Sequence, residues 1–267
     1  MVNFEPLITA RDRIAVQFAN GDPIRHVTID DFLNPVAAKR ALDAFPSVQA
    51  MEIAFAGLAE VKSADQAIDR LDPIFGSIFD ELHSQRFVQW LSGVTRVPGL
   101  IGDVDLHGGG LHQGTDGSYL DVHADFNIHP KLSLYRRLNL LIYLNHTWER
   151  QWQGYLELWS RDMLECRAEI EPKFNRCVIM ETHDHAYHGY KELRLPQGTT
   201  RKSLASYYYS AERSDAQAEV QHDTLFQLRP DQRRATGARQ LARRLIALAP
   251  PPLRPLARAI RRVLSLD

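Results

Sequence analysis

The sequence LDVHADF at residues 120–126 gives the clearest indication of both the architecture and the chemistry of this chain. Its alternating pattern predicts the end of a β-strand, on which His123 and Asp125 point to the same face with Cα atoms roughly 6–7 Å apart. On a helix the two side chains would diverge by about 200°. An imidazole and a carboxylate on one face suit iron, zinc or manganese better than calcium. Because two ligands do not make a metal site, a third ligand is expected elsewhere in the chain.

The 267 residues have the composition of a globular protein, with 44% hydrophobic and 24% charged side chains. A chain of this length can bury a sizeable core as one large domain or two small ones. No run of about 18 apolar residues predicts a membrane span, and the first residues, MVNFEP, lack the features of a signal peptide. Two cysteines, Cys166 and Cys177, do not make a disulfide framework. A location in the reducing cytoplasm is therefore expected.

The C-terminal segment 231–267 differs in charge from the rest of the chain. It holds nine Arg and two Asp, so its formal charge is +7, whereas residues 1–230 carry −8. Apolar residues at helical spacing over 253–264, with arginines on the other side, predict a basic amphipathic helix. Three interpretations stay open: a helix docked on the main domain, peripheral contact with the anionic inner face of a membrane, and binding of an acidic partner. The segment has no nucleic-acid-binding motif, so nucleic acid is not expected as a partner.

Residues 1–97 are expected to form helices that support the rest of the fold. Asn34 and Pro35 make a favourable helix start, as N-cap and first helical residue. Residues 73–97 predict two further short helices, and residues 26–33 predict a strand leading into a turn. No chemistry is evident in this part of the sequence.

From Pro98 onward, short apolar runs separated by Gly, Asp and His predict an antiparallel sandwich or jelly roll. Residues 137–145 form the strongest strand and are expected to be central. The glycines at 108–110 and 114–117 predict a flexible loop, which either covers a site or is a plain surface loop. The other expected strands span residues 100–106, 119–125, 155–159, 176–181 and 203–210.

The third metal ligand is expected among the histidines of residues 182–189, which follow an apolar strand. His188 is the best candidate because Gly189 allows close backbone approach; His185 and then His183 are the alternatives. Two His and one carboxylate on one face leave open positions on an octahedral metal, which is the facial triad of non-haem Fe(II) oxygenases. A closed structural zinc site would require a fourth protein ligand.

Arg201 and Ser203 share one face of a later strand, and Lys202 points away. A guanidinium inside a barrel can bind a carboxylate through two hydrogen bonds, with the hydroxyl beside it. The alternative is a surface arginine in an ordinary salt bridge.

Together, His123-x-Asp125, His188-Gly189 and Arg201-x-Ser203 resemble the 2-oxoglutarate/Fe(II)-dependent dioxygenases, specifically their prolyl-4-hydroxylase-like branch, over about residues 95–212. Two departures stand out. The family often has Gly-Gly where this chain has Gly154-Tyr155, and many prolyl hydroxylases have Lys at the position of Arg201, so prolyl substrates do not follow.

The resemblance implies a jelly-roll (double-stranded β-helix) core of α+β class. His123, Asp125 and His188 would bind Fe(II), and Arg201 would bind 2-oxoglutarate, with the co-substrate contacts completed by Ser203, Tyr119 and Asn139. Asn139 could equally be a plain buried, hydrogen-bonded residue. The other co-substrate would be O2, with ascorbate as an optional reductant.

The expected reaction is hydroxylation of an unactivated C–H bond in a small molecule or peptidyl residue, with 2-oxoglutarate converted to succinate and CO2. The expected domain spans residues 1–230, with helical support over 1–97, the jelly-roll core over 98–212 and the basic tail over 231–267. Two alternatives remain: a cupin-like zinc or manganese hydrolase or isomerase, and a non-catalytic β-sandwich that binds a ligand.

Overall fold

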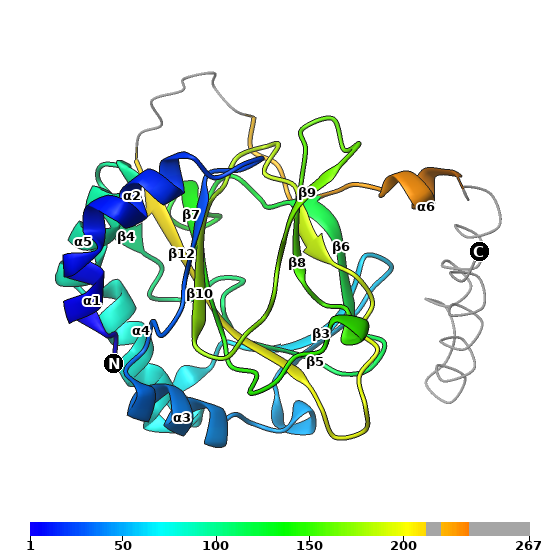
Figure 1. Ribbon diagram of the computed structural model, residues 1–267, viewed down its shortest axis with the longest axis horizontal. Helices are drawn as coiled ribbons and strands as arrows, with labels where there is room; N and C mark the ends of the chain where they lie inside the picture. The colour runs from blue at the N-terminus through cyan, green and yellow to red at the C-terminus, as the bar shows by residue number, and fades with distance from the viewer. Residues whose placement is uncertain (212–219, 235–267) are drawn as a thin grey trace.

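The computed structural model describes residues 1–211 and 220–234 (Figure 1). Within these residues, thirteen strands join in one sheet whose main path runs β1-β10-β7-β12-β5-β3-β6-β11-β8-β9, and every pairing is antiparallel. The strands are β1 His26–Ile29, β2 Ile53–Ala56, β3 Glu60–Asp65, β4 Ile101–Gly102, β5 Gly110–Gly114, β6 Tyr119–Ala124, β7 Tyr135–Tyr143, β8 Leu156–Trp159, β9 Cys166–Ile170, β10 Arg176–Glu181, β11 His188–Tyr190, β12 Arg201–Ser210 and β13 Leu225–Phe226.

The sheet curls until its two ends face each other, as the strands β7, β10 and β12 on one side and β6 and β8 on the other show in Figure 1. A buried cluster fills the space between the two halves, with Val178 and Met180 from β10 packed near Leu156 and Leu158 from β8. A curled antiparallel sheet of this kind is a double-stranded β-helix, so the predicted jelly-roll core is confirmed. The site described below lies inside this curl.

Five helices cover the outer face of β7, β10 and β12, on the left of Figure 1. They are α1 Phe4–Thr9, α2 Arg11–Ala19, α3 Pro35–Asp43, α4 Pro73–His83 and α5 Gln85–Thr95. The Asn34 side chain caps α3 by accepting a hydrogen bond from the Val36 amide, with Pro35 at the first position, as the sequence predicts. Apolar side chains of the helices pack against Leu138, Leu140 and Ile142 of β7 in the largest core cluster. The expected supporting role of these helices agrees with this packing.

Two features of the sheet differ from expectation. The strand predicted at 26–33 is present as β1, paired with β10, but β2 and β3 form where helices were expected, and β3 lies between β5 and β6 in the sheet. The glycine-rich stretch before the metal pair is not a flexible loop, because Gly110–Gly114 forms strand β5 between β12 and β3. Gly110 has φ +86°, and a Cβ atom there would lie 2.3 Å from the carbonyl oxygen of Asp65. Glycine at this position therefore permits the close approach of β5 to β3 rather than mobility.

The other predicted strands agree with the structure to within about two residues, with two exceptions: residues 100–106 yield only the short β4, and the segment 26–33 is a strand only as far as Ile29. The chain after β12 returns along the sheet edge as β13, which pairs with β6, and enters helix α6, Pro230–Arg234. Most of the predicted basic tail, residues 235–267, lies outside the described residues. Among the helices that are described, none combines the length and apolar character that crossing a membrane requires.

Candidate metal centre

The pairing of β6 with β11 brings together two histidines that are far apart in the sequence. His188 lies directly opposite His123, and the centroids of their rings are 4.3 Å apart. A register shift follows at once, since Tyr190 lies opposite Leu120. At Gly189, a Cβ atom would lie 2.8 Å from the carbonyl oxygen of Leu120, so the close approach expected of this glycine is present.

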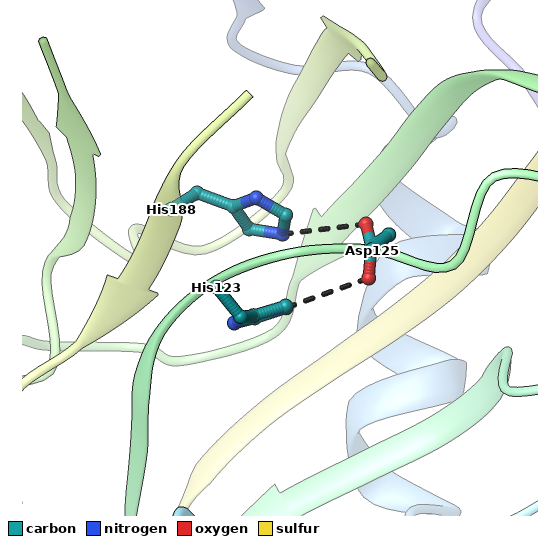
Figure 2. A group of neighbouring side chains, drawn as sticks. All are labelled: His123, Asp125 and His188. Carbon is teal, nitrogen blue, oxygen red and sulfur yellow. Dashed lines mark ion pairs between the residues drawn. The ribbon is translucent and has the colours of Figure 1, made fainter. Parts of the chain in front are cut away.

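Asp125, just beyond the end of β6, completes the group shown in Figure 2. Its Oδ1 atom lies 3.4 Å from Nε2 of His123, and its Oδ2 atom lies 3.5 Å from Nε2 of His188. One ligand-type atom from each residue lies within 4.8 Å of the others, and no other such group of three occurs within residues 1–211 and 220–234. Both histidines are buried. The structure therefore brings His188 to the pair; by contrast, Nε2 of His185 lies 3.1 Å from the Arg161 guanidinium at the exposed surface.

The hydrogen bonds of the two histidines orient them for metal binding. Nδ1 of His123 lies 2.9 Å from the carbonyl oxygen of Asp121, and Nδ1 of His188 lies 2.9 Å from that of Ala186. A carbonyl oxygen only accepts, so each Nδ1 carries the proton and each Nε2 presents its lone pair toward Asp125. Hydrogen bonds of this kind to Nδ1 are typical of metal-binding histidines.

The charges at the site also suit a cation. Burial and the neighbouring His123 lower the pKa of His188 to about 4, so this imidazole is neutral near pH 7. Burial opposes ionisation of Asp125, but Arg136, with His188 and His123, holds the pKa of this carboxyl well below its usual range. A neutral Nε2 lone pair thus faces an ionised carboxylate without a proton between them, an arrangement that a divalent cation would satisfy. The residues present fit an iron ion.

Asp125 is held from its other side by two residues of β7. The Asn139 amide donates to Oδ2 at 2.7 Å, and an Arg136 nitrogen lies 3.2 Å from the same oxygen. The Asn139 carbonyl in turn accepts two hydrogen bonds from Arg136, at 2.8 and 3.0 Å. Asn139, expected among the co-substrate contacts, therefore has a carboxylate and a guanidinium as its partners. The sequence interpretation missed Arg136, although two successive arginines in an otherwise apolar strand were a signal.

Arg201 lies at the start of β12 and is 7% exposed. Its Nε donates to the carbonyl oxygen of Gly154 at 2.8 Å, and Nη2 donates to the hydroxyl of Tyr143 at 3.2 Å. The guanidinium also lies over the rings of Tyr143 and Tyr190, at 4.9 and 4.3 Å from their centroids. Within the described residues no carboxylate lies at ion-pair distance from Arg201, so the surface salt bridge considered as its alternative is not present. A buried guanidinium without an anion is well suited to receive an acid.

Of the two other predicted co-substrate contacts, Ser203 lies near Arg201, whereas the hydroxyl of Tyr119 binds elsewhere. Ser203 is buried and lies opposite Tyr143 of β7 and His112 of β5, next to Arg201 along the strand. The Tyr119 hydroxyl instead donates to the carbonyl oxygens of the turn between β2 and β3. Tyr143 was missed as a site residue because a tyrosine in a buried apolar strand looks like ordinary core.

Comparison with known proteins points to one superfamily. The sequence model of the 2OG-Fe(II) oxygenase superfamily matches residues 109–209. No curated protein matches the sequence.

Solved structures share the fold at low sequence identity. A Pseudomonas putida prolyl-4-hydroxylase is 14% identical with a TM-score of 0.53, covering 74% of this chain and 98% of that one. A Trichoplax adhaerens prolyl hydroxylase, solved with a hypoxia-inducible-factor peptide, is 15% identical with a TM-score of 0.54. The match covers 77% of this chain and 93% of the hydroxylase. The α-ketoglutarate-dependent epimerase SnoN from nogalamycin biosynthesis is 11% identical with a TM-score of 0.50. The match covers 83% of this chain and 97% of the epimerase.

The predicted cofactors, Fe(II) and 2-oxoglutarate, are those of the matched superfamily. The matched segment contains all three residues of the His123–Asp125–His188 group together with Arg201. Residues 109–209 therefore resemble the 2OG-Fe(II) oxygenase superfamily over the part of the chain that holds the candidate metal centre.

Proposed function

We propose that this protein is a 2-oxoglutarate-dependent dioxygenase that hydroxylates an unactivated C–H bond of a small molecule or a peptidyl residue. His123, Asp125 and His188 would be the Fe(II) ligands. The observation that carries the proposal is the opposition of His188 and His123 across β6 and β11, with Asp125 between their Nε2 atoms. Three ligands on one side of a metal leave coordination positions for co-substrate and O2.

Arg201 is the proposed partner of the distal carboxylate of 2-oxoglutarate. Its guanidinium is buried, keeps donors to spare after its bonds to Gly154 and Tyr143, and has no described carboxylate partner. The Tyr143 hydroxyl and Ser203 are close enough along the paired strands to add hydrogen bonds to the same carboxylate. We assign Asn139 to Asp125 rather than to the co-substrate, and Tyr119 to the turn that its hydroxyl contacts.

The chain's own residues position the reactants and exclude water. When bound, Fe(II) and 2-oxoglutarate supply the oxidising power, with 2-oxoglutarate converted to succinate and CO2. The buried tyrosine rings around Arg201 exclude solvent from the expected acid site, which strengthens its electrostatic attraction. We further propose that residues 1–230 act as one catalytic domain, since helices, sheet and return strand share packed contacts.

The test is substrate-independent turnover with Fe(II), 2-oxoglutarate and O2, measured as succinate. The wild type is expected to release succinate slowly, and Asp125→Ala and His188→Ala are expected to abolish release. His185→Ala is the matched control, because this half-buried neighbour lies outside the group and contacts Arg161, and it should retain the wild-type rate. Turnover that survives in both site variants would refute the proposal.

Two other results separate the alternatives. Tight zinc retention without succinate formation would indicate a hydrolase, and failure to bind any metal would indicate a non-catalytic binding module. A screen of metabolite pools for compounds that accelerate succinate release would then identify the substrate class. Product analysis is needed to distinguish hydroxylation from other outcomes, because the epimerase SnoN shares this fold.

A further inference from the structure

From the contacts of Asp125 we infer that Arg136, acting with Asn139, is a positioning residue that holds one oxygen of this carboxylate away from the metal and leaves the other as the metal ligand. The inference rests on the proposed metal-binding function of Asp125. It concerns how the carboxylate is oriented, and therefore the metal affinity of the site.

The two oxygens of Asp125 have different surroundings. Oδ2 accepts from the Asn139 amide at 2.7 Å, lies 3.2 Å from Nη2 of Arg136, and lies 3.5 Å from Nε2 of His188. Oδ1 lies 3.4 Å from Nε2 of His123 and, within the described part of the chain, has no ion pair or hydrogen bond with β7. Each oxygen lies near the Nε2 atom of one histidine, but only Oδ2 is also bound by donors from β7, so Oδ1 is the oxygen that would be left to bind a metal. The carboxylate would therefore bind through one oxygen rather than both.

Arg136 is fixed in one orientation from several sides. Its guanidinium lies over the rings of Phe126 and Tyr207, 4.6 and 3.6 Å from their centroids, and the residue is 2% exposed. Two of its nitrogens donate to the carbonyl oxygen of Asn139. These two hydrogen bonds turn the other end of the Asn139 amide, its NH2 group, toward Asp125. A planar fork can make this set of contacts, and the point charge of a lysine cannot.

A register shift in β7 makes the arrangement possible. Tyr208 of β12 lies opposite Leu138, but Tyr209 lies opposite Arg136, so β7 has one extra residue at this point. Residues three apart on a regular strand point to opposite faces. The extra residue brings Arg136 and Asn139 to the same side, where both reach Asp125.

Two effects of Arg136 on a bound metal oppose each other. Its positive charge repels a divalent cation, whereas its hydrogen bonds hold the carboxylate ready for that cation. The repulsion is reduced because the guanidinium lies over two aromatic rings and is paired with Asp125 itself. Loss of a hydrogen-bonding partner of a metal ligand typically costs about 10- to 100-fold in metal affinity. We therefore expect the orienting effect to dominate.

The experiment measures Mn(II) binding to the chelator-treated full chain, without 2-oxoglutarate, by titration calorimetry or electron paramagnetic resonance. Arg136→Lys keeps the charge and removes the fork, and Arg136→Met removes both. Both variants are expected to bind Mn(II) about 10- to 100-fold more weakly than the wild type. Arg137→Met is the matched control, because this neighbouring arginine is also buried but donates to Ser210, and its affinity should stay within about threefold of the wild type.

Circular dichroism establishes that each variant is folded. If Arg136→Met does not fold, Arg136→Lys and Asn139→Ala decide, and both are expected to weaken binding. Wild-type affinity in Arg136→Lys, or tighter binding in Arg136→Met, would overturn the inference. The Asp125→Ala variant distinguishes a failure of the inference about Arg136 from a failure of the proposed function. If Asp125→Ala binds Mn(II) as tightly as the wild type, or if the wild type binds no Mn(II), the metal site itself is wrongly assigned.

Discussion

Substituting Gly189 by alanine tests whether the metal centre depends on the close approach of β11 to β6. The new Cβ atom would lie 2.8 Å from the carbonyl oxygen of Leu120 and 2.9 Å from that of Asp121. Both obstacles are backbone atoms of the strand that carries His123, so they cannot rotate away as a side chain could. Ordinary contact begins at about 3.4 Å, so the two strands must separate by several tenths of an ångström. Overpacking of this kind costs about 1–3 kcal/mol in unfolding free energy.

The displacement would fall directly beside His188, which precedes the substituted residue. Functional groups must be held to within about 0.5 Å of their working geometry, so we expect Mn(II) affinity to fall about tenfold. The midpoint temperature of thermal unfolding should fall by about 2–10 °C for a chain of this size. Gly76→Ala on helix α4 is the matched control, because its nearest neighbour would lie at 3.9 Å and alanine favours a helix. A Gly189→Ala protein that is destabilised but binds Mn(II) like the wild type would refute the link between strand spacing and the site.

Four further predictions follow from other parts of the chain. Arg201→Met should weaken 2-oxoglutarate binding about 10- to 100-fold in calorimetry with Mn(II) present, because a charge-assisted hydrogen bond is lost, while Mn(II) affinity alone stays unchanged. Arg229→Met should lower the unfolding free energy in urea by about 1–3 kcal/mol, because Asp121 and Glu157 both lose a charge-assisted contact while Glu157 keeps Lys191 and Trp159 as partners. The hydrogen bond from Arg176 lowers the pKa of Asp30 to about 2, so the ionised carboxylate stabilises the fold above about pH 4 and this stabilisation is lost as the pH falls toward 2. Asp30→Asn should therefore reduce the acid-induced loss of unfolding free energy over that range, as measured by urea titrations at several pH values. Deletion of residues 235–267 should reduce co-sedimentation with anionic vesicles if the basic tail contacts membranes, and unchanged sedimentation would remove that expectation.

Sequence reasoning performed well where the local pattern carries the information. The His123-x-Asp125 pair depends only on the period of a strand, and the cap at Asn34 depends only on neighbouring residues. Both are present. The choice among three histidines at 182–189 rested on one glycine, and the steric role of Gly189 agrees with the geometry.

The expectations that failed concern pairing between distant segments. A run of glycines and polar residues at 110–114 resembles a loop, yet it forms β5 because β3 and β12 supply hydrogen-bonding partners on both sides. Strand β3 itself lies in a region that was expected to be helical. Neither partner can be deduced from the local composition, since strand propensity depends strongly on the neighbouring strands.

Arg136 was missed because the strand that carries it is irregular. A periodic reading of β7 places Arg137, Asn139, Leu141 and Tyr143 on one face and Arg136 on the other, and this reading holds until the register shift at Arg137. The shift moves Arg136 to the side of Asn139, and so creates the contacts with Asp125. A second shift lies beside the histidine pair, between His188 and Tyr190. The candidate site is therefore built at two interruptions of regular strand geometry, where periodicity fails as a guide and where bulges commonly redirect side chains toward functional sites.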